Sequence, residues 1–314
     1  MAYSRPLTDK DQVRHFLNQV LEYDYEECKD IVSHIVDGEI GIANKSNYES
    51  QTLTSTKVRN DEYLEENSRW RLRKQIIKEL IESERLENDE QISLGKGGIL
   101  PLTGVKSDRQ AIIIIGLPAS GKSSIASKIA DNYGAVILDS DFAKRKLPEF
   151  NVHIYGATIV HEESSQITFG FQGNRGELKS VYESCLENGY NMVIPKIGES
   201  PKKIFNLAKA LKEQNNYDIH LISVELTKRD ATIRAIKRFN ETKRYVPLGL
   251  IFDQYGNDSH LCYYFLRCKY PDLFKSFGAL SNNVPLGQNP VCTDIFGESS
   301  PASDYKEVQN LIPL

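Results

Sequence analysis

The chain has 314 residues, of which 40% are hydrophobic and 26% charged, and its formal net charge is −4. These values are ordinary for a globular protein with one large α/β domain and an appendage, and they do not favour nucleic acid as a partner. The five cysteines show no CxxC spacing, which argues against a disulfide framework or a zinc site. The first residues lack the apolar region of a signal peptide, and no apolar run is long enough to span a membrane. We therefore expect a cytoplasmic protein without a membrane partner.

Residues 8–90 show a helical and polar pattern. TDKDQVRHFLNQVLEYDY begins with a possible cap formed by Thr8 and Asp11, and the helical period returns at 64–87. The predicted apolar faces consist of Val13, Phe16, Leu17, Val20 and Leu21, and of Trp70, Ile76, Ile77, Leu80 and Ile81. A polar loop is expected at 41–60, and the Gly- and Pro-rich stretch 93–109 indicates a linker. We place a boundary near residue 95, between a helical N-terminal extension (1–95) and the main domain (96–314).

Short apolar runs alternate with helix-length segments in the main domain. The apolar runs lie at 111–115, 135–139, 191–195 and 219–226, and the helical patterns lie at 123–133, 175–189 and 201–216. This alternation predicts a parallel sheet covered by helices on both faces, which is a three-layer α/β fold. Beyond residue 280 the sequence is rich in turn-forming residues and shows little periodicity.

The stretch GLPASGKS at 116–123 fits the pattern G-x-x-x-x-G-K-[ST] and stands between a predicted strand and a predicted helix. Its glycines allow the backbone N–H groups to turn toward phosphates, and Lys122 neutralises the phosphate oxygens, while Ser123 offers a ligand for Mg²⁺. The alternative is a Gly-rich turn with a solvated lysine. We predict an ATP site formed by Gly116, Leu117, Pro118, Ala119, Ser120, Gly121, Lys122, Ser123 and Ser124.

Two aspartates follow the second apolar run, in the segment AVILDSDFAKRKLPEF. Parallel strands end at the same edge of a sheet, so Asp139 and Asp141 should lie near the γ-phosphate. A carboxylate there accepts the proton of an attacking hydroxyl or helps to position magnesium, as a kinase requires. The alternative for either residue is a helix cap.

A basic helix is predicted late in the main domain, in the segment DATIRAIKRFNETKRYVP. Arg234 and Arg238 are four residues apart on its polar face, and Arg244 follows. Such a helix can close over a transferring phosphoryl group, although a solvated basic face would show the same pattern. A switch GTPase is disfavoured because no Asn-Lys-x-Asp motif ends a strand, and a motor ATPase because NMVIPKIG ends without an aspartate.

These motifs resemble the zeta-toxin family of P-loop kinases, bacterial enzymes that phosphorylate UDP-N-acetylglucosamine and related sugar nucleotides. The resemblance covers about 111–250 and rests on GLPASGKSS, ILDSDFAKRKLPEF, ENGYNMVI and TKRDATIRAIKRFNETKRYVP. It implies that Lys122 and Ser123 serve ATP and Mg²⁺. It also implies that Asp141 is the catalytic base and that Arg238 and Arg244 contact the ATP phosphates.

The acceptor side departs from the family pattern, because Pro195 stands where the family has an acidic residue. His161, Glu162 and Glu163 are alternative acceptor contacts, or else part of a solvated helix face. Lys196, next to the proline, suits an anionic acceptor. We expect an ATP-dependent kinase whose small-molecule acceptor is a UDP-N-acetylhexosamine. The alternatives are a polynucleotide 5′-hydroxyl kinase and a nucleotide-gated interaction module.

The role of the N-terminal helices is left open by the sequence. Zeta-type toxins are restrained by a helical antitoxin that blocks ATP, so a separate antitoxin is one possible partner. The segment RWRLRK at 69–74 would act as a built-in inhibitor if it reached the active site. The alternative is a stabilising extension of the fold, since an amphipathic helix buries one face.

Overall fold

A computed structural model describes residues 6–24, 26, 29–45, 50–171, 178–242, 244–285 and 287–305. Within these residues, one six-stranded sheet has the order β2-β3-β1-β4-β5-β6; β6 is antiparallel to β5, and the other pairs are parallel. The strands are β1 (Gln110–Gly116), β2 (Val136–Ile137), β3 (Met192–Lys196), β4 (Asp218–Glu225), β5 (Ser276–Ser281) and β6 (Val291–Gly297). The first four confirm the predicted strands. Strands β5 and β6 were not predicted, because glycine and serine interrupt the apolar residues of β5, and Thr293 and Asp294 interrupt those of β6.

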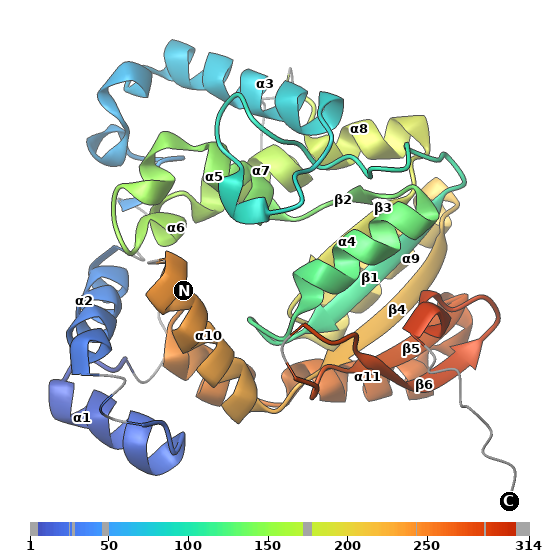
Figure 1. Ribbon diagram of the computed structural model, residues 1–314. Helices are drawn as coiled ribbons and strands as arrows, with labels where there is room; N and C mark the ends of the chain where they lie inside the picture. Colours follow the sequence, from blue (N-terminus) through green and yellow to red (C-terminus); the bar gives the residue numbers. More distant parts are fainter. Residues whose placement is uncertain are drawn as a thin grey trace, which may run out of the picture.

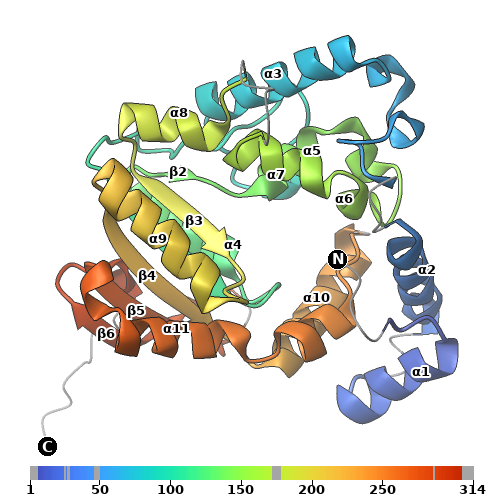
Figure 2. The ribbon, with the colours of Figure 1, turned by 180° about the vertical axis from the view of Figure 1, so that it is seen from behind.

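The predicted three-layer arrangement is confirmed around the central strand β1. Its isoleucines are fully buried, and Ile113 lies opposite Ile194 of β3 and Leu221 of β4. Helix α4 (Lys122–Tyr133) covers one face of the sheet, while α9 (Pro201–Asn215) and α11 (Asp258–Lys269) cover the other (Figures 1 and 2). A strand buried on both faces is apolar at every position, which explains the uninterrupted isoleucine run.

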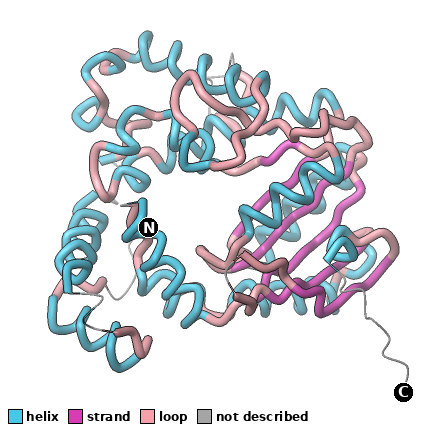
Figure 3. The backbone as a smooth tube through the Cα atoms, viewed as in Figure 1, coloured by secondary structure: helices cyan, strands magenta, loops and turns pink. Residues whose placement is uncertain are grey.

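Helices make up the half of the molecule away from the sheet (Figure 3). Beyond β2 lie α5 (Ser140–Lys146), α6 (Gly156–Ile159), α7 (His161–Phe169) and α8 (Val181–Asn188), with α3 (Glu66–Glu82) packed over them. A second group of helices lies below α6 in Figure 1, where α10 (Lys228–Thr242) is beside α2 (Lys29–Lys45) and near α1 (Lys10–His15). Two π-helical turns, Phe16–Val20 and Leu250–Tyr255, complete this region. Among the described residues, no helix has both the length and the apolar character needed to cross a bilayer.

The N-terminal helices bury their apolar faces against the main domain. Leu72, Ile76 and Leu80 of α3 belong to the same core cluster as the strands of the sheet. Helices α1 and α2 share a second cluster with α10, in which Leu17 packs with Ile35 and Phe239. These contacts favour the interpretation of the N-terminal helices as a stabilising part of the fold.

Three details of the first two helices differ from the sequence analysis. Asp9 caps α1 by accepting hydrogen bonds from the amides of Asp11 and Gln12, so the cap is not formed by Thr8. Val20 is 39% exposed, because it ends a π-helical turn whose wider spacing shifts it off the buried face. Helix α2 extends to Lys45 and thus occupies the start of the predicted 41–60 loop.

The buried face of α3 is partly polar, contrary to the sequence analysis. Trp70 is 37% exposed, whereas Arg69 and Arg73 on the same helix are almost fully buried. Their guanidinium groups face inward because buried carboxylates on the packed helices receive them. Apolar periodicity alone therefore assigned the wrong residues to this end of the helix.

Candidate active site

The loop between β1 and α4 has the tight turn that its sequence predicts. Ala119 and Gly121 have positive φ values of 60° and 90°. A Cβ atom on Gly116 would lie 2.7 Å from the carbonyl oxygen of Val224, and one on Gly121 would lie 2.1 Å from Asn282 Nδ2. Gly116 is therefore required by the close approach of the Val224 backbone, and Gly121 by its positive φ together with the Asn282 side chain. The loop delivers the chain directly into α4, whose first turn carries the exposed side chains of Ser123 and Ser124.

The side chain of Lys122 folds back over this loop. Its Nζ donates hydrogen bonds to the carbonyl oxygens of Gly116 at 2.7 Å and Leu117 at 2.6 Å. Burial lowers the pKa of Lys122 to about 8, although the negative charges of Asp139 and Asp141 act in the opposite direction. A phosphate group placed above the loop would supply the anionic partner that this ammonium group lacks in the described contacts.

Asp139 caps helix α5, as the alternative interpretation predicted. Its Oδ1 accepts a hydrogen bond of 3.0 Å from the backbone N–H of Asp141, the second residue of α5. Burial, together with the charge of Asp141, raises the pKa of Asp139. The capping bond fixes the start of α5 and thereby orients Asp141 at the edge of the sheet, close enough to Lys122 to influence its pKa.

Asp141 remains ionised in this environment. Its Oδ1 lies 2.6 Å from Lys144 Nζ, one turn along α5. Burial acts to raise the pKa of Asp141, but the positive charges of Lys144 and Arg145 outweigh it and hold this pKa well below its usual range. Such a carboxylate can accept a hydrogen bond from a hydroxyl group. This bond orients a lone pair of the hydroxyl oxygen toward a phosphorus atom.

Arginines from two elements meet on the far side of Asp141. Arg145 of α5 and Arg244, which follows α10, both form ion pairs with the carboxylate of Glu90, and Arg244 also lies 4.8 Å from the ring centroid of Phe150. Burial lowers the pKa of Arg244, and the nearby charges of Arg145 and Arg238 lower it further. The predicted Arg238 and Arg244 thus share one cationic region with Asp141 and Lys122.

The predicted acceptor residues fall into two groups. Lys196, at the end of β3, has its Nζ 3.5 Å from the ring centroid of Phe169. Burial lowers the pKa of Lys196 to about 8, and the nearby Asp139 counteracts this. His161 and Glu162 are exposed at the start of α7, where His161 experiences the charges of Lys144 and Asp141. Lys196 and His161 therefore border the site, whereas Glu162 is placed only as the neighbour of His161.

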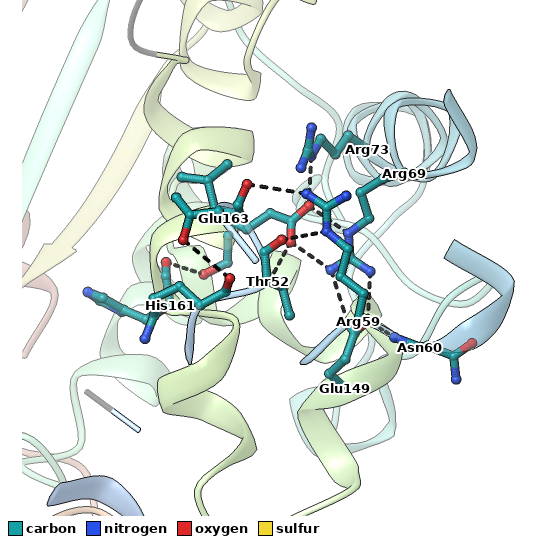
Figure 4. Close-up of polar contacts among 12 residues, drawn as sticks. Thr52, Arg59, Asn60, Arg69, Arg73, Glu149, His161 and Glu163 are labelled. Carbon is teal, nitrogen blue, oxygen red and sulfur yellow. Dashed lines mark hydrogen bonds and ion pairs between the residues drawn. The ribbon is translucent and has the colours of Figure 1, made fainter. Parts of the chain in front are cut away.

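Glu163 does not border the site, which corrects the sequence analysis. It is fully buried, and it pairs with Arg69 and Arg73 at 2.6 Å each while accepting a hydrogen bond of 2.5 Å from Thr52. Figure 4 shows Glu163 turned toward α3, with His161 on the other side of α7. Burial acts to raise the pKa of Glu163, but the two arginines lower it to about 2. Its role is structural, and the RWRLRK segment likewise uses its two buried arginines for packing.

Three contacts at the site escaped the sequence analysis. Asn282, just after β5, donates a hydrogen bond of 2.6 Å from Nδ2 to the carbonyl oxygen of Ser120. Arg234 of α10 donates in turn to the carbonyl oxygens of Asn282 at 2.9 Å and Val284 at 3.1 Å. Recognising the short run SFGALS as a strand would have placed Asn282 at the same sheet edge as the phosphate loop. Glu90 and Arg145 are the other residues missed.

The site combines a glycine-containing phosphate loop, which connects the central parallel strand to a helix, with a lysine that folds over the loop and an aspartate at the same sheet edge. This combination defines a P-loop kinase. Residues 103–258 match the family model described as zeta toxin, and this part of the chain therefore belongs to the zeta toxin family. The resemblance inferred from the motifs is confirmed. The protein is an ATP-dependent phosphotransferase that uses an alcohol group as acceptor.

Several solved structures are similar to the chain. One comes from the PezAT chromosomal toxin-antitoxin system of Streptococcus pneumoniae, with a TM-score of 0.44, 17% identity, and coverage of 65% of this chain and 78% of that chain. A chain of the AvrRxo1-ORF1:-ORF2 complex with ATP has a TM-score of 0.42 and 13% identity, with coverage of 72% and 63%. A gluconokinase from Sinorhizobium meliloti 1021 has a TM-score of 0.32 and 14% identity, with coverage of 58% and 87%. No curated protein sequence matches the chain.

Proposed function

We propose that the chain transfers the γ-phosphate of Mg²⁺-bound ATP to a hydroxyl group of a UDP-N-acetylhexosamine. The observation that carries this proposal is the position of the ionised Asp141 at the same sheet edge as the phosphate loop and Lys122. A kinase requires these groups together, because the acceptor hydroxyl must approach the γ-phosphorus in line while the phosphate charge is neutralised.

In this mechanism the loop 116–124 holds the phosphates of ATP. The backbone N–H groups before α4 and the positive end of the helix face the phosphate oxygens, and Lys122 exchanges its two carbonyl partners for them. The exposed hydroxyl of Ser123 would supply one protein ligand to Mg²⁺, and phosphate oxygens and water would supply the others. Among the described residues, no cluster of three or more acidic, histidine or cysteine side chains competes for this role.

Asp141 orients the acceptor hydroxyl and receives its proton. The transition state of phosphoryl transfer is loose, so the hydroxyl keeps its proton until transfer is well advanced. A carboxylate with a depressed pKa suits this order, because it stays ionised and accepts a hydrogen bond throughout the approach. Arg238 and Arg244 stabilise the charge on the transferring group, which is supported by the influence of Arg244 on the pKa of Asp141 and of Arg238 on the pKa of Lys122.

The acceptor assignment rests on the cationic character of the β3 end. Pro195 pairs with Ile114 in the sheet and offers no carboxylate, and the next residue is Lys196. An ammonium group beside Asp139 favours an acceptor with an anionic part, such as the diphosphate of a nucleotide sugar. A helical antitoxin as a separate partner stays a prediction.

The test is phosphate transfer from γ-labelled ATP with Mg²⁺, followed by mass spectrometry over a panel of UDP-sugars, dinucleotides and oligonucleotides. We expect a UDP-N-acetyl sugar to gain one phosphate. Asp141→Asn should lower this rate by about 10²- to 10⁴-fold, the range for loss of a general base. The exposed Asp272→Asn is the matched control and should retain activity.

The other outcomes separate the competing assignments. Phosphorylation of oligonucleotides alone would replace the acceptor with a nucleic acid 5′-hydroxyl. ATP binding without phosphorylation of any UDP-sugar would refute the acceptor assignment, and absence of ATP binding would refute the proposed mechanism as a whole.

A further inference from the structure

Glu90 brings a carboxylate from the N-terminal region to the arginines of the site. It lies in the short turn Asp89–Gln91, and its backbone N–H donates to Asn88 Oδ1 at 3.0 Å, which fixes the start of the turn. Its Oε1 lies 3.3 Å from Arg145 Nη2, and its Oε2 accepts a hydrogen bond from Arg244 Nη1. These two arginines come from segments 55 and 154 residues away along the chain.

The two guanidinium groups are more deeply buried than the carboxylate that joins them. The Arg145 and Arg244 side chains are 8% and 14% exposed, whereas that of Glu90 is 34% exposed. The Nε atoms of both arginines are buried and have no hydrogen-bond partner among the described residues. Glu90 therefore offsets one of the two positive charges from the solvent side, and the Nε donors of both arginines remain unused.

The backbone beside Arg244 is held by a different part of the N-terminal region. The Tyr245 hydroxyl donates to Glu39 Oε1 of α2 at 2.5 Å. Its ring packs against Gly38, where a Cβ atom would lie only 2.7 Å away. Because Tyr245 is anchored, the contact between Arg244 and Glu90 can change by side-chain rotation while the chain around it stays in place.

Resting on the proposed function, we propose that Glu90 is an internal counter-ion that competes with the phosphates of ATP for the Arg145–Arg244 pair. A polyphosphate carries more charge and more acceptor oxygens than one carboxylate, so it can displace Glu90 and use the unpartnered donors as well. The Glu90 carboxylate, which is already partly exposed, then moves into solvent. In the absence of nucleotide, Glu90 offsets one of the two positive charges of the arginine pair, and this contact lowers the affinity of the site for ATP.

The test is the substitution Glu90→Gln in the full chain, with equilibrium binding of Mg²⁺-ATP measured by titration calorimetry. The amide keeps the size of the side chain but removes its charge. Loss of a partly exposed competing ion pair should tighten ATP binding by about two- to fivefold. The gain should shrink at high salt, where such pairs are screened. The matched control is the exposed Glu87→Gln, which removes one charge from the same segment and should leave ATP affinity unchanged.

A second measurement repeats E90Q in an Arg244→Gln background, where the gain in ATP affinity should be smaller because one of the two freed arginines is absent. An undiminished gain there, an equal gain in Glu87→Gln, or unchanged or weaker ATP binding in E90Q would each overturn the inference. If neither the native chain nor E90Q binds ATP, the proposed function fails along with it. Unchanged ATP binding in E90Q refutes the role of Glu90 alone.

Discussion

Two groups of charged residues lie on either side of α5 and α7, and they are arranged in opposite ways. The Arg69 cluster (Arg69, Arg73, Glu149 and Glu163) is at most 6% exposed at its side chains, and each of its carboxylates is bound by at least one guanidinium group. At the sheet edge that carries the phosphate loop, by contrast, Lys122 donates to backbone carbonyls of its own loop. Burial lowers the pKa of Lys122, which favours its neutral form.

The difference shows how a structural charge cluster can be told from a ligand site. Buried ions are costly unless they are paired, so a structural cluster supplies the partners from within the chain. A binding site leaves cationic groups without their best partner, because the ligand provides it. The contrast is testable, since changes in the first group should affect folding and changes in the second should affect activity.

Among the changes that test this contrast, the largest effect is expected from Lys122→Ala. Removing the ammonium group that neutralises the phosphates should lower the turnover number by about 10³-fold. The stability of the protein should change little, because the lost contacts are two hydrogen bonds to backbone carbonyls. Kinase assays and thermal unfolding of the same preparation measure both quantities. The control is Lys128→Ala on the exposed side of α4, and a large loss of stability in Lys122→Ala would contradict the contrast.

Arg69→Met should have the reverse effect. It leaves the carboxylate of Glu149, which is 6% exposed, without its guanidinium partner, and loss of one member of a buried ion pair costs about 3–5 kcal/mol of unfolding free energy. Urea denaturation measures this loss. The exposed Arg71→Met on the same helix should stay within about 0.5 kcal/mol of the native chain. Equal stability of the two variants would show that the cluster contributes little to folding.

Glu39 gives a smaller effect that depends on pH. Burial raises the pKa of Glu39 to about 7 from 4.5, and its hydrogen bond with Tyr245 only partly counteracts this. Between these two pH values the folded chain holds a proton that the unfolded chain has released. The native free energy of unfolding should therefore decrease as pH rises through this window.

Glu39→Gln should remove that decrease. We expect the variant to match the native chain near pH 4.5 and to exceed its unfolding free energy by about 1–3 kcal/mol at pH 8. Chemical denaturation at the two pH values measures the difference. The exposed Asp37→Asn on α2 is the control and should stay close to the native chain at both. A variant with the native dependence on pH would show that Glu39 does not carry this proton.

Lys196→Ala should have the smallest of these effects and should act on the acceptor alone. If Lys196 holds an anionic part of the acceptor, its loss should raise the acceptor KM by about tenfold, as expected for one charge-assisted hydrogen bond. The ATP dissociation constant should not change. The exposed Lys202→Ala serves as the control. An unchanged acceptor KM, or a parallel loss of ATP affinity, would place Lys196 outside acceptor binding.

The sequence predicted the parts of the site whose chemistry is contiguous in the chain. The phosphate loop and Asp141 each sit within a few residues of a strand end, so the strand pattern was enough to bring them together. Asn282 contacts the loop from 162 residues away, and Glu90 contacts Arg244 across 154. No local pattern reports such pairs, and β5, which positions Asn282, has too few apolar residues in succession to stand out.

The buried face of α3 shows a second limit. Helical periodicity identifies apolar residues that repeat every three or four positions, and it correctly placed Ile76, Ile77 and Leu80 inside. It could not place Arg69 inside, because the reason for that burial lies in carboxylates elsewhere in the fold. A charged residue that continues the apolar face of a helix can be predicted as buried only when its oppositely charged partner is known. The tertiary structure is needed to identify that partner.

The wide separation of the Arg69 cluster in the chain also bears on its biosynthesis. The partners of Arg69 come 80 and 94 residues after it, so the ribosome completes α3 long before Glu149 and Glu163 are made. Until then Arg69 and Arg73, the two arginines of this helix that become buried, remain hydrated, and its apolar residues lack the sheet that covers them. Contacts between residues so far apart form late and slow folding. Helix α3 therefore reaches its final position only after the later segments that carry Glu149 and Glu163 have been made.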